Sequence, residues 1–362
     1  MNPIIEKTQV RECSRLIGLP DGDELAAILY GYGAGQMENA ELYDTSHGPD
    51  DIRWNYIIDR RYVLRFCNAP DMEEARLEDL NGLIARYRAF GLKCPLFLKA
   101  ADGSYFHCWK SLSVYLSEFI DLPVAEETEL KDPDALRREV VISIARFMQR
   151  YRDVGLISVM GMYSLFDLSP FDIPEGIDEK QQNMDRVCDA LRGIGQTALA
   201  EKLAGRDRAV RAFLLKVYRR LPRCVTQGDE NFSNVLIDGQ QRLAGLIDFN
   251  LAGTDVCANL IANNADFDLD IMHDRPVNAE AVLEKAFIGY RRNAAMILRE
   301  YHATAAELEA LPYFAWIALA AQYPYVCAYI DRIGQDGCCE STLRLLELIA
   351  ELDLNRLRAE EA

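Results

Sequence analysis

No uninterrupted apolar run in this sequence is long enough to cross a membrane. The longest apolar stretch, residues 313 to 326, contains polar residues and a proline, and it falls short of the roughly 20 residues that a spanning helix needs. The N-terminal residues also lack the basic start, apolar core and small-residue cleavage site of an export signal. We therefore expect no contact with a membrane and a cytoplasmic location.

Paired cysteine motifs are also missing. The ten cysteines are scattered apart from the neighbours Cys338 and Cys339, and none has the C-x-x-C spacing of a zinc knuckle or redox motif. The four histidines show no metal-ligand spacing with each other or with the cysteines. We expect reduced, mostly buried thiols rather than a zinc site or a disulfide framework.

Basic residues are outnumbered by acidic ones. Lys and Arg total 40 against 57 Asp and Glu, which gives a formal charge of −17. A surface of this sign repels nucleic acid and anionic lipid, so neither is expected as a partner. The same charge would attract a cationic substrate, but acidity that serves only solubility is the explanation we favour.

The chain has 362 residues, which is longer than a single hydrophobic core usually grows, so two lobes are expected. The first, residues 1–120, is rich in strand patterns. We expect a helix over residues 23–30, an antiparallel meander of strands over 39–46, 52–59 and 61–66, a helix over 70–91, and two strands over 94–100 and 105–120 joined by a turn at 101–104.

The second lobe, residues 121–362, is mainly helical. Asp132 and Pro133 begin a helix with a continuous apolar stripe, and helical patterns cover about residues 177–221 and most of 278–358. Residues 224–251 are the remaining β-rich stretch. These strand and helix patterns therefore predict an α+β fold. It has a small antiparallel sheet lobe, carrying one helix, and a larger helical lobe.

The β-rich stretch contains an ordered set of polar residues. In VTQGDENFSNVLIDG, Asp229 is followed five positions later by Asn234, and the strand LAGLIDFNLAG then offers Asp248. Phosphoryl transfer needs magnesium held against phosphates and a hydroxyl aimed at the terminal phosphorus. Magnesium takes hard oxygen ligands, usually one or two carboxylates. This order and the first spacing are those of a kinase catalytic segment.

QGDENFSNVL followed by LIDFNLAG resembles the signature of the aminoglycoside phosphotransferase and choline kinase superfamily, which consists of small-molecule kinases with a bilobal protein-kinase-like fold. The resemblance implies that Asp229 is the catalytic base and that Asn234 and Asp248 hold Mg2+. It further implies a nucleotide-binding lobe at 1–120, a catalytic and substrate-binding lobe at 121–362, ATP or GTP as phosphoryl donor, and a small-molecule hydroxyl as acceptor.

Upstream residues take further expected roles from the same resemblance. YVLRF ends a third strand where these kinases usually place a lysine on the α- and β-phosphates, so Arg65 is the candidate for that role. Its acidic partner would be Glu74 or Glu78, which lie one turn apart on the next helix, and we favour Glu78. Backbone groups of Ser117 and Phe119 would read the adenine edge. The turn of residues 45–48 would cover the phosphates, although no G-x-G-x-x-G loop is present.

One residue departs from the family pattern at its centre. The histidine before Gly-Asp is Gln227 here, and glutamine can still donate and accept the hydrogen bonds that support the loop. The alternative function is a pseudokinase, a nucleotide-binding module without acceptor phosphorylation. A protein kinase proper is disfavoured because D-F-G and A-P-E elements are missing.

Two polar residues just past Asp248 have two interpretations. Asn250 and Asp255 could contact the acceptor, or they could end a strand and cap the next helix, which we favour. The identity of the acceptor and the oligomeric state stay open at this stage, because specificity depends on the shape of a pocket.

Overall fold

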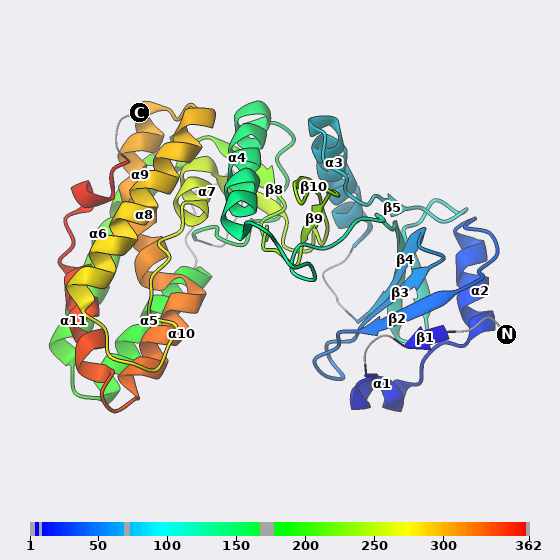
Figure 1. The fold of residues 1–362 in the computed structure, drawn as a ribbon, viewed down its shortest axis with the longest axis horizontal. Coiled ribbons are helices and arrows are strands. Elements are labelled where there is room, and N and C mark those ends of the chain that lie inside the picture. Colours follow the sequence, from blue (N-terminus) through cyan, green and yellow to red (C-terminus); the bar gives the residue numbers. More distant parts are fainter. Residues whose placement is uncertain (1–3, 7–8, 69–72, 167–176, 360–362) are drawn as a thin grey trace. The chain divides into compact units, whose positions relative to one another are not determined.

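The computed structural model describes residues 4–6, 9–68, 73–166 and 177–359 (Figure 1). The chain forms two compact units, of which the first contains residues 1–131 and 230–248 and the second contains residues 132–229 and 249–362. The expected division into a nucleotide-binding lobe ending at residue 120 and a catalytic lobe after it stays a prediction. Packing assigns residues 121–131 and 230–248 to the unit that holds the sheet.

The first unit is built on a seven-stranded sheet with the order β1-β2-β3-β4-β7-β5, in which β6 also pairs with β7. β1 is parallel to β2, and the other described pairs of this sheet are antiparallel. The predicted meander of β2, β3 and β4 is confirmed. The strands are β1 (Ile4–Glu6), β2 (Ala40–Asp44), β3 (Arg53–Ile58), β4 (Tyr62–Cys67), β5 (Phe97–Leu98), β6 (Phe106–Trp109) and β7 (Leu112–Glu118).

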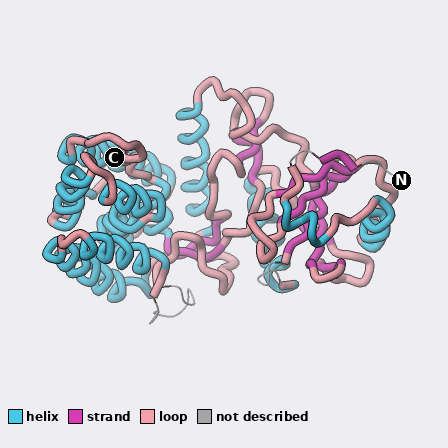
Figure 2. The backbone as a smooth tube through the Cα atoms, turned by 90° about the horizontal axis from the view of Figure 1, so that it is seen from below, coloured by secondary structure: helices cyan, strands magenta, loops and turns pink. Residues whose placement is uncertain are grey.

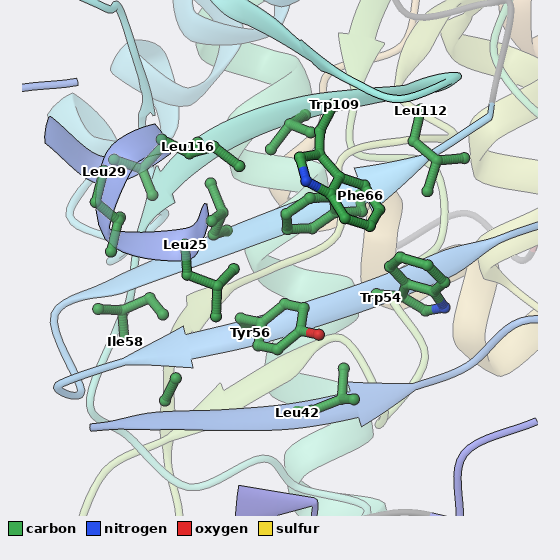
Figure 3. Close-up of a cluster of buried hydrophobic side chains, with 14 of the residues drawn as sticks. Leu25, Leu29, Leu42, Trp54, Tyr56, Ile58, Phe66, Trp109, Leu112 and Leu116 are labelled. Atoms are coloured by element: carbon green, nitrogen blue, oxygen red, sulfur yellow. The ribbon is translucent and has the colours of Figure 1, made fainter. Parts of the chain in front are cut away.

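One face of this sheet packs against α2 (Gly22–Gly31), which begins at a capping box between Asp21 and Glu24. Strand side chains alternate between the two faces, so every second residue of the central strands enters this core. Figure 3 shows its members from α2, β3, β4 and β7 gathered on that face. The core includes Leu25, Leu29, Leu42, Trp54, Tyr56, Ile58, Leu64, Phe66, Trp109, Val114 and Leu116.

Two other helices complete the first unit. α1 (Glu12–Ile17) precedes α2, and α3 (Glu74–Phe90) follows β4. The helix predicted over residues 70–91 ends where expected, at Gly91, whose φ of 105° gives a left-handed C-cap. Residues 70–72 of that prediction lie outside the described residues. The helices predicted over residues 23–30 and 70–91 therefore correspond to α2 and α3, and α1 is present in addition to them.

The strand predicted over residues 105–120 is wrong in one respect. It is two strands, β6 and β7, which form a hairpin by pairing Trp109 with Leu112. Lys110 makes the turn with a φ of 52°, and lysine is not a residue that indicates a turn. β5 consequently pairs with β7 rather than with the strand that follows it in sequence.

A second hairpin belongs to the first unit although its sequence lies far from the sheet. β9 (Val235–Ile237) and β10 (Leu243–Leu246) are antiparallel, and β10 also bonds to the segment that follows α3. Lys93 N–H donates to the carbonyl of Ala244 at 2.9 Å, and Leu246 N–H donates to the carbonyl of Lys93 at 3.1 Å. Segment 123–126 bonds to β9 through Ala125 and Pro123.

The second unit is mainly helical, as Figure 2 shows by colour. Its single two-stranded sheet among the described residues pairs β8 with β11. Its elements are α4 (Pro133–Tyr151), α5 (Glu179–Gly193), α6 (Thr197–Val217), η1 (Tyr218–Arg220), β8 (Arg223–Thr226), β11 (Gly253–Val256), α7 (Cys257–Asn264), α8 (Ala279–Glu300), α9 (Ala305–Ala321), α10 (Tyr323–Ile333), α11 (Cys339–Ala350) and η2 (Leu354–Leu357).

The helix start predicted at Asp132 and Pro133 is found in this unit. Asp132 caps α4 by accepting from Ala135 N–H at 2.8 Å, and Pro133 is the first helical residue. α9 is buried on nearly all sides, with Trp316 at its centre, and α5, α6, α7 and α10 pack against it. The predicted α+β class, with a small, mainly antiparallel sheet and a larger helical portion, is confirmed.

None of the helices in the described ranges is both long and apolar enough to span a membrane. The ten cysteines are all free thiols, and six of them are buried. The prediction that most cysteines are buried is confirmed, and their reduced state stays a prediction.

The contact between β10 and Lys93 allows a test of the first unit's packing. A Cβ at Gly245 would lie 2.1 Å from the carbonyl oxygen of Lys93, whereas a Cβ at Gly82, inside α3, meets nothing within 4 Å. We expect Gly245→Ala to lower the free energy of unfolding by more than about 2 kcal/mol, because backbone must move. Gly82→Ala should raise it by up to about 1 kcal/mol. Chemical denaturation followed by tryptophan fluorescence measures both, and equal effects would contradict this account.

Candidate nucleotide and metal site

Asn234 and Asp248 lie at the same end of the β9–β10 hairpin. Val235 pairs with Leu246, and one step further Ile247 N–H donates to the carbonyl of Asn234 at 3.0 Å. The two side chains therefore come from adjacent strand ends of one hairpin. Asn234 is buried and Asp248 is exposed. The pair supplies an amide oxygen and a carboxylate, which are oxygen donors that magnesium accepts.

The backbone of Asp248 has a left-handed conformation, with a φ of 53°. Most residues avoid this region because of a clash at Cβ, but aspartate and asparagine tolerate it better than others. Strain of this kind persists where surrounding structure fixes it, and it concentrates at functional positions. The conformation agrees with a functional role for Asp248 but does not single it out, because eight other described non-glycine residues also have a positive φ.

Arg65 lies in the same unit, on β4, and is partly buried. Its Nε donates to Oδ1 of Asn55 at 2.7 Å, and its Nη1 donates to the hydroxyl of Tyr115 at 3.3 Å. Burial lowers the pKa of Arg65, but Tyr115 and Asp248 raise it more, so the net pKa lies above the usual range. Arg65 thus stays charged and interacts electrostatically with the carboxylate of Asp248. The structure brings together three predicted residues: Arg65, Asn234 and Asp248.

The expected ion pair between Arg65 and Glu78 is wrong. Glu78 accepts from the hydroxyl of Tyr105 at 2.7 Å and pairs with Lys99 at 3.1 Å, with most of its side chain exposed. The other candidate, Glu74, accepts from Ser104 Oγ at 2.6 Å and from Tyr105 N–H at 2.9 Å. Both acids of α3 are occupied by the segment of residues 99–106, which the helical spacing of the two glutamates did not reveal.

The segment predicted to read a nucleotide base, around Ser117 and Phe119, forms backbone hydrogen bonds within the sheet. Phe119 N–H donates to the carbonyl of Arg61 at 2.8 Å, so the alternating ladder places the backbone groups of Ser117 on Val63. The N–H of Phe119 and both backbone groups of Ser117 are therefore engaged within the sheet. A role in base recognition for these two residues stays a prediction, and it would have to involve the carbonyl of Phe119 or a side chain.

Two backbone groups in this segment, the carbonyl of Glu118 and the N–H of Ile120, make none of the described hydrogen bonds outside the helices and sheet ladders. The carboxylate of Glu118 accepts from Leu96 N–H at 3.1 Å in place of its own carbonyl, and it also pairs with Arg88 at 2.9 Å.

The turn of residues 45–48 is held firmly to its own unit. His47 N–H donates to the carbonyl of Asp51 at 3.0 Å, and Arg53 N–H donates to the hydroxyl of Ser46 at 2.9 Å. Ser46 is buried, so its hydroxyl faces the interior. The expectation that this turn covers phosphates stays a prediction, and it would depend on backbone N–H groups.

Asp229 belongs to the second unit and directly follows β8 and Gly228. Gly228 has a φ of 85°, and a Cβ there would lie 2.8 Å from the carbonyl oxygen of Leu251, so the turn requires glycine. Gln227 is fully buried, and its Oε1 accepts from Asp229 N–H at 2.7 Å. Glutamine therefore supports the loop by a hydrogen bond, as expected from its chemistry.

Asp255 lies in the interior of the second unit. It is 1% exposed, and its carboxylate accepts from Val256 N–H at 2.7 Å and from Asn259 Nδ2 at 3.0 Å. Burial raises the pKa of Asp255 to about 7, against lowering by these hydrogen bonds and by Lys180 and Arg223. Asp255 thus organises the start of α7, the structural alternative, rather than facing solvent. Asn250 is exposed.

Comparison with known proteins assigns the family. Residues 54–258 match the model of the phosphotransferase enzyme family. This match covers more than half of the chain, so the chain belongs to the phosphotransferase enzyme family. The resemblance seen in the sequence is confirmed. A search of curated protein sequences found no match.

Several solved structures resemble this one at low sequence identity. A microcompartment-associated aminopropanol kinase is 13% identical, with 93% of this chain and 97% of that chain covered and a TM-score of 0.49. The amicoumacin kinase hAmiN, solved with AMP-PNP and Ca2+, is 13% identical over 87% and 91%, with a TM-score of 0.49. A streptomycin–ATP complex of APH(2″)-IIa is 13% identical over 91% and 99%, with a TM-score of 0.47.

Gln227 offers a test of the loop that carries Asp229. We expect Gln227→Ala to lower the free energy of unfolding by about 1–3 kcal/mol, because a backbone N–H loses its acceptor. Gln227→Glu keeps an accepting oxygen but buries a carboxylate, so it should not restore the stability lost in Gln227→Ala. Gln240→Ala, at an exposed turn, should have no effect. Denaturant midpoints of the three variants measure this, and a neutral Gln227→Ala would contradict it.

Asp255 predicts a pH dependence of stability. Its folded pKa of about 7 exceeds the ordinary 3.8, so folding favours the neutral acid. Its contribution to stability is complete below about pH 4 and is lost as pH rises through about 7, by on the order of a few kcal/mol. We expect Asp255→Asn to lose less unfolding free energy than wild type between about pH 5 and about pH 8.

A matched control for this pH test lies in the same unit. The ion pair with Arg146 lowers the pKa of Glu300, so its contribution changes only at more acidic pH. Glu300→Gln should therefore keep the wild-type slope over the tested interval. Denaturation curves at each pH give the slopes, and parallel slopes for wild type and Asp255→Asn would refute the assignment.

Proposed function

We propose that this chain is an ATP- and Mg2+-dependent phosphotransferase that transfers the γ-phosphoryl group to a hydroxyl of a small molecule. One observation carries the proposal. Asn234 and Asp248 come from adjacent strand ends of one hairpin, and the guanidinium of Arg65 is electrostatically coupled to Asp248 within the same unit. Membership of the phosphotransferase enzyme family supports the reaction class.

The residues of the first unit fit a nucleotide with a divalent cation. The donor set is one carboxylate and one amide oxygen, and magnesium usually takes few protein ligands and completes its shell with phosphate and water. Asn234 and Asp248 would hold this ion, which when bound neutralises charge on the phosphates. Arg65 would contact the α- and β-phosphates, and the Glu118 carbonyl and Ile120 N–H would contact the base.

Asp229 would act on the acceptor. Its carboxylate would accept a hydrogen bond from the acceptor hydroxyl, aim that oxygen at the γ-phosphorus and take up its proton as the new oxygen–phosphorus bond forms. The bond between the γ-phosphorus and the bridging oxygen breaks, and ADP leaves. Gln227, through its hydrogen bond to Asp229 N–H, keeps the loop ordered without contacting the reacting atoms.

The second candidate is a nucleotide-binding module without acceptor phosphorylation. It is motivated by Gln227 in place of the family histidine and by the closely held turn of residues 45–48, which is not a G-x-G-x-x-G loop. Slow ATP hydrolysis that disappears in Asp229→Asn would argue for the enzyme. Nucleotide binding with no turnover across a panel of hydroxyl compounds would favour the module. GTP is an alternative phosphoryl donor, and the identity of the acceptor is open. A cytoplasmic location is a further prediction.

The metal site provides the decisive prediction. Wild type should gain about 2.7 kcal/mol of stability from Mg-ATP at a hundredfold excess over its dissociation constant. Asp248→Asn keeps a residue that tolerates the left-handed backbone but removes the charge, so the Mg2+-dependent part of the gain and at least about 99% of turnover should be lost.

Asp238→Asn is the matched control, because Asp238 lies at the far end of the same hairpin and bonds to the N–H groups of Gln240 and Arg242. It should bind Mg-ATP as wild type does. Thermal denaturation with and without Mg2+ and ATP measures all three proteins. Identical behaviour of Asp248→Asn and Asp238→Asn would remove the basis of the proposed function.

A further inference from the structure

Arg65 is the centre of a row of polar side chains that crosses three strands. Asn55 on β3 pairs in register with Arg65 on β4, and Arg65 pairs with Tyr115 on β7. Directly opposed residues in a sheet point to the same face. Their sequence neighbours, such as Trp54, Phe66 and Leu116, enter the core on the other face (Figure 3). The row is therefore separate from that core.

Both partners of Arg65 in this row are uncharged. Asn55 accepts from Nε at 2.7 Å, and the hydroxyl of Tyr115 accepts from Nη1 at 3.3 Å. Tyr115 is buried and is held edge-on by Phe97 at 5.7 Å and Phe106 at 5.8 Å. Burial raises the pKa of Tyr115, so its hydroxyl stays neutral. Of the five N–H donors of a guanidinium, these bonds use two and leave the others for a ligand.

The acids of α3 are committed elsewhere. Glu78 pairs with Lys99, and Glu74 bonds to Ser104 and Tyr105. In protein kinases the equivalent basic residue pairs with a glutamate of the following helix, so its position depends on that helix. In this chain Arg65 is held by the sheet alone, among the contacts that the structure describes.

We propose that Asn55 and Tyr115 are positioning residues that fix the Arg65 guanidinium for nucleotide phosphate and make phosphate binding independent of α3. This inference rests on the proposed function, because it assumes that Arg65 contacts phosphate. Neutral anchors fix the orientation of the guanidinium without cancelling its charge. The full charge then acts on the nucleotide, with Asp248 as the acidic group electrostatically coupled to Arg65.

The experiment compares two ligands, Mg-ATP and adenosine, by calorimetric titration of the full chain. Asn55→Ala should weaken Mg-ATP about tenfold, because a charge-assisted hydrogen bond that orients Arg65 is lost. Adenosine has no phosphate, so its affinity should stay unchanged. Tyr115→Phe keeps the ring packing and removes only the hydroxyl, and it should weaken Mg-ATP by a smaller factor with the same selectivity.

Three further variants complete the test. Arg65→Ala gives the full loss of the phosphate contact. Asn55→Asp keeps an accepting oxygen but sets a negative charge against Arg65, so it should not recover the loss seen in Asn55→Ala. Glu78→Gln, on α3, should bind both ligands as wild type does. In steady-state assays Asn55→Ala should raise KM for ATP more than it lowers kcat.

The outcomes separate this inference from the proposed function. If wild type binds no Mg-ATP, the proposed function fails. If wild type binds and Arg65→Ala does not, while Asn55→Ala and Tyr115→Phe bind normally, the inference alone is overturned. A tenfold loss in Glu78→Gln, or an equal loss of adenosine in Asn55→Ala, would also overturn it, because the first restores a role for α3 and the second indicates general damage.

Discussion

The hydrogen bond from Ile247 N–H to the carbonyl of Asn234 fixes the geometry of the candidate site. It extends the β9–β10 ladder by one step and so places an amide and a carboxylate from separate parts of the motif side by side. The hairpin is itself bonded on both sides, to Lys93 through β10 and to residues 123–126 through β9. Gly245 is the point where this attachment is closest, since no side chain fits against Lys93.

The charge pattern of the first unit follows from that placement. Asp248 contributes a negative charge near a guanidinium that has only neutral hydrogen-bond partners in its own sheet. The acids of α3, which the kinase comparison would assign to Arg65, instead hold the segment that leads into β6. Under the proposed function, Arg65 would bind the negative phosphates of a magnesium nucleotide complex and Asp248 its positive ion.

Much of this molecule follows from the sequence because local signals agree with tertiary packing. The alternation in β2, β3 and β4, the capping residues Asp132 and Gly91, and the ordered motif around Asp229 each have a local physical cause, so they were predictable. The β6–β7 turn was missed because Lys110 adopts a conformation that its residue type does not signal. The partners of Arg65 were missed because strand register joins Asn55 and Tyr115 across 60 residues of sequence, and no local pattern encodes register. The engagement of Ser117 and Phe119 likewise became visible only from the ladder.

The left-handed backbone at Asp248 restricts what can replace it. Glutamate has the same charge, but its longer side chain lacks the aspartate's tolerance of this conformation, and it would carry its oxygens one carbon further from the strand end. Glycine would fit the backbone and bring no ligand. Under the proposed function, both the backbone conformation and metal coordination limit which amino acids can replace Asp248, so very few would be acceptable.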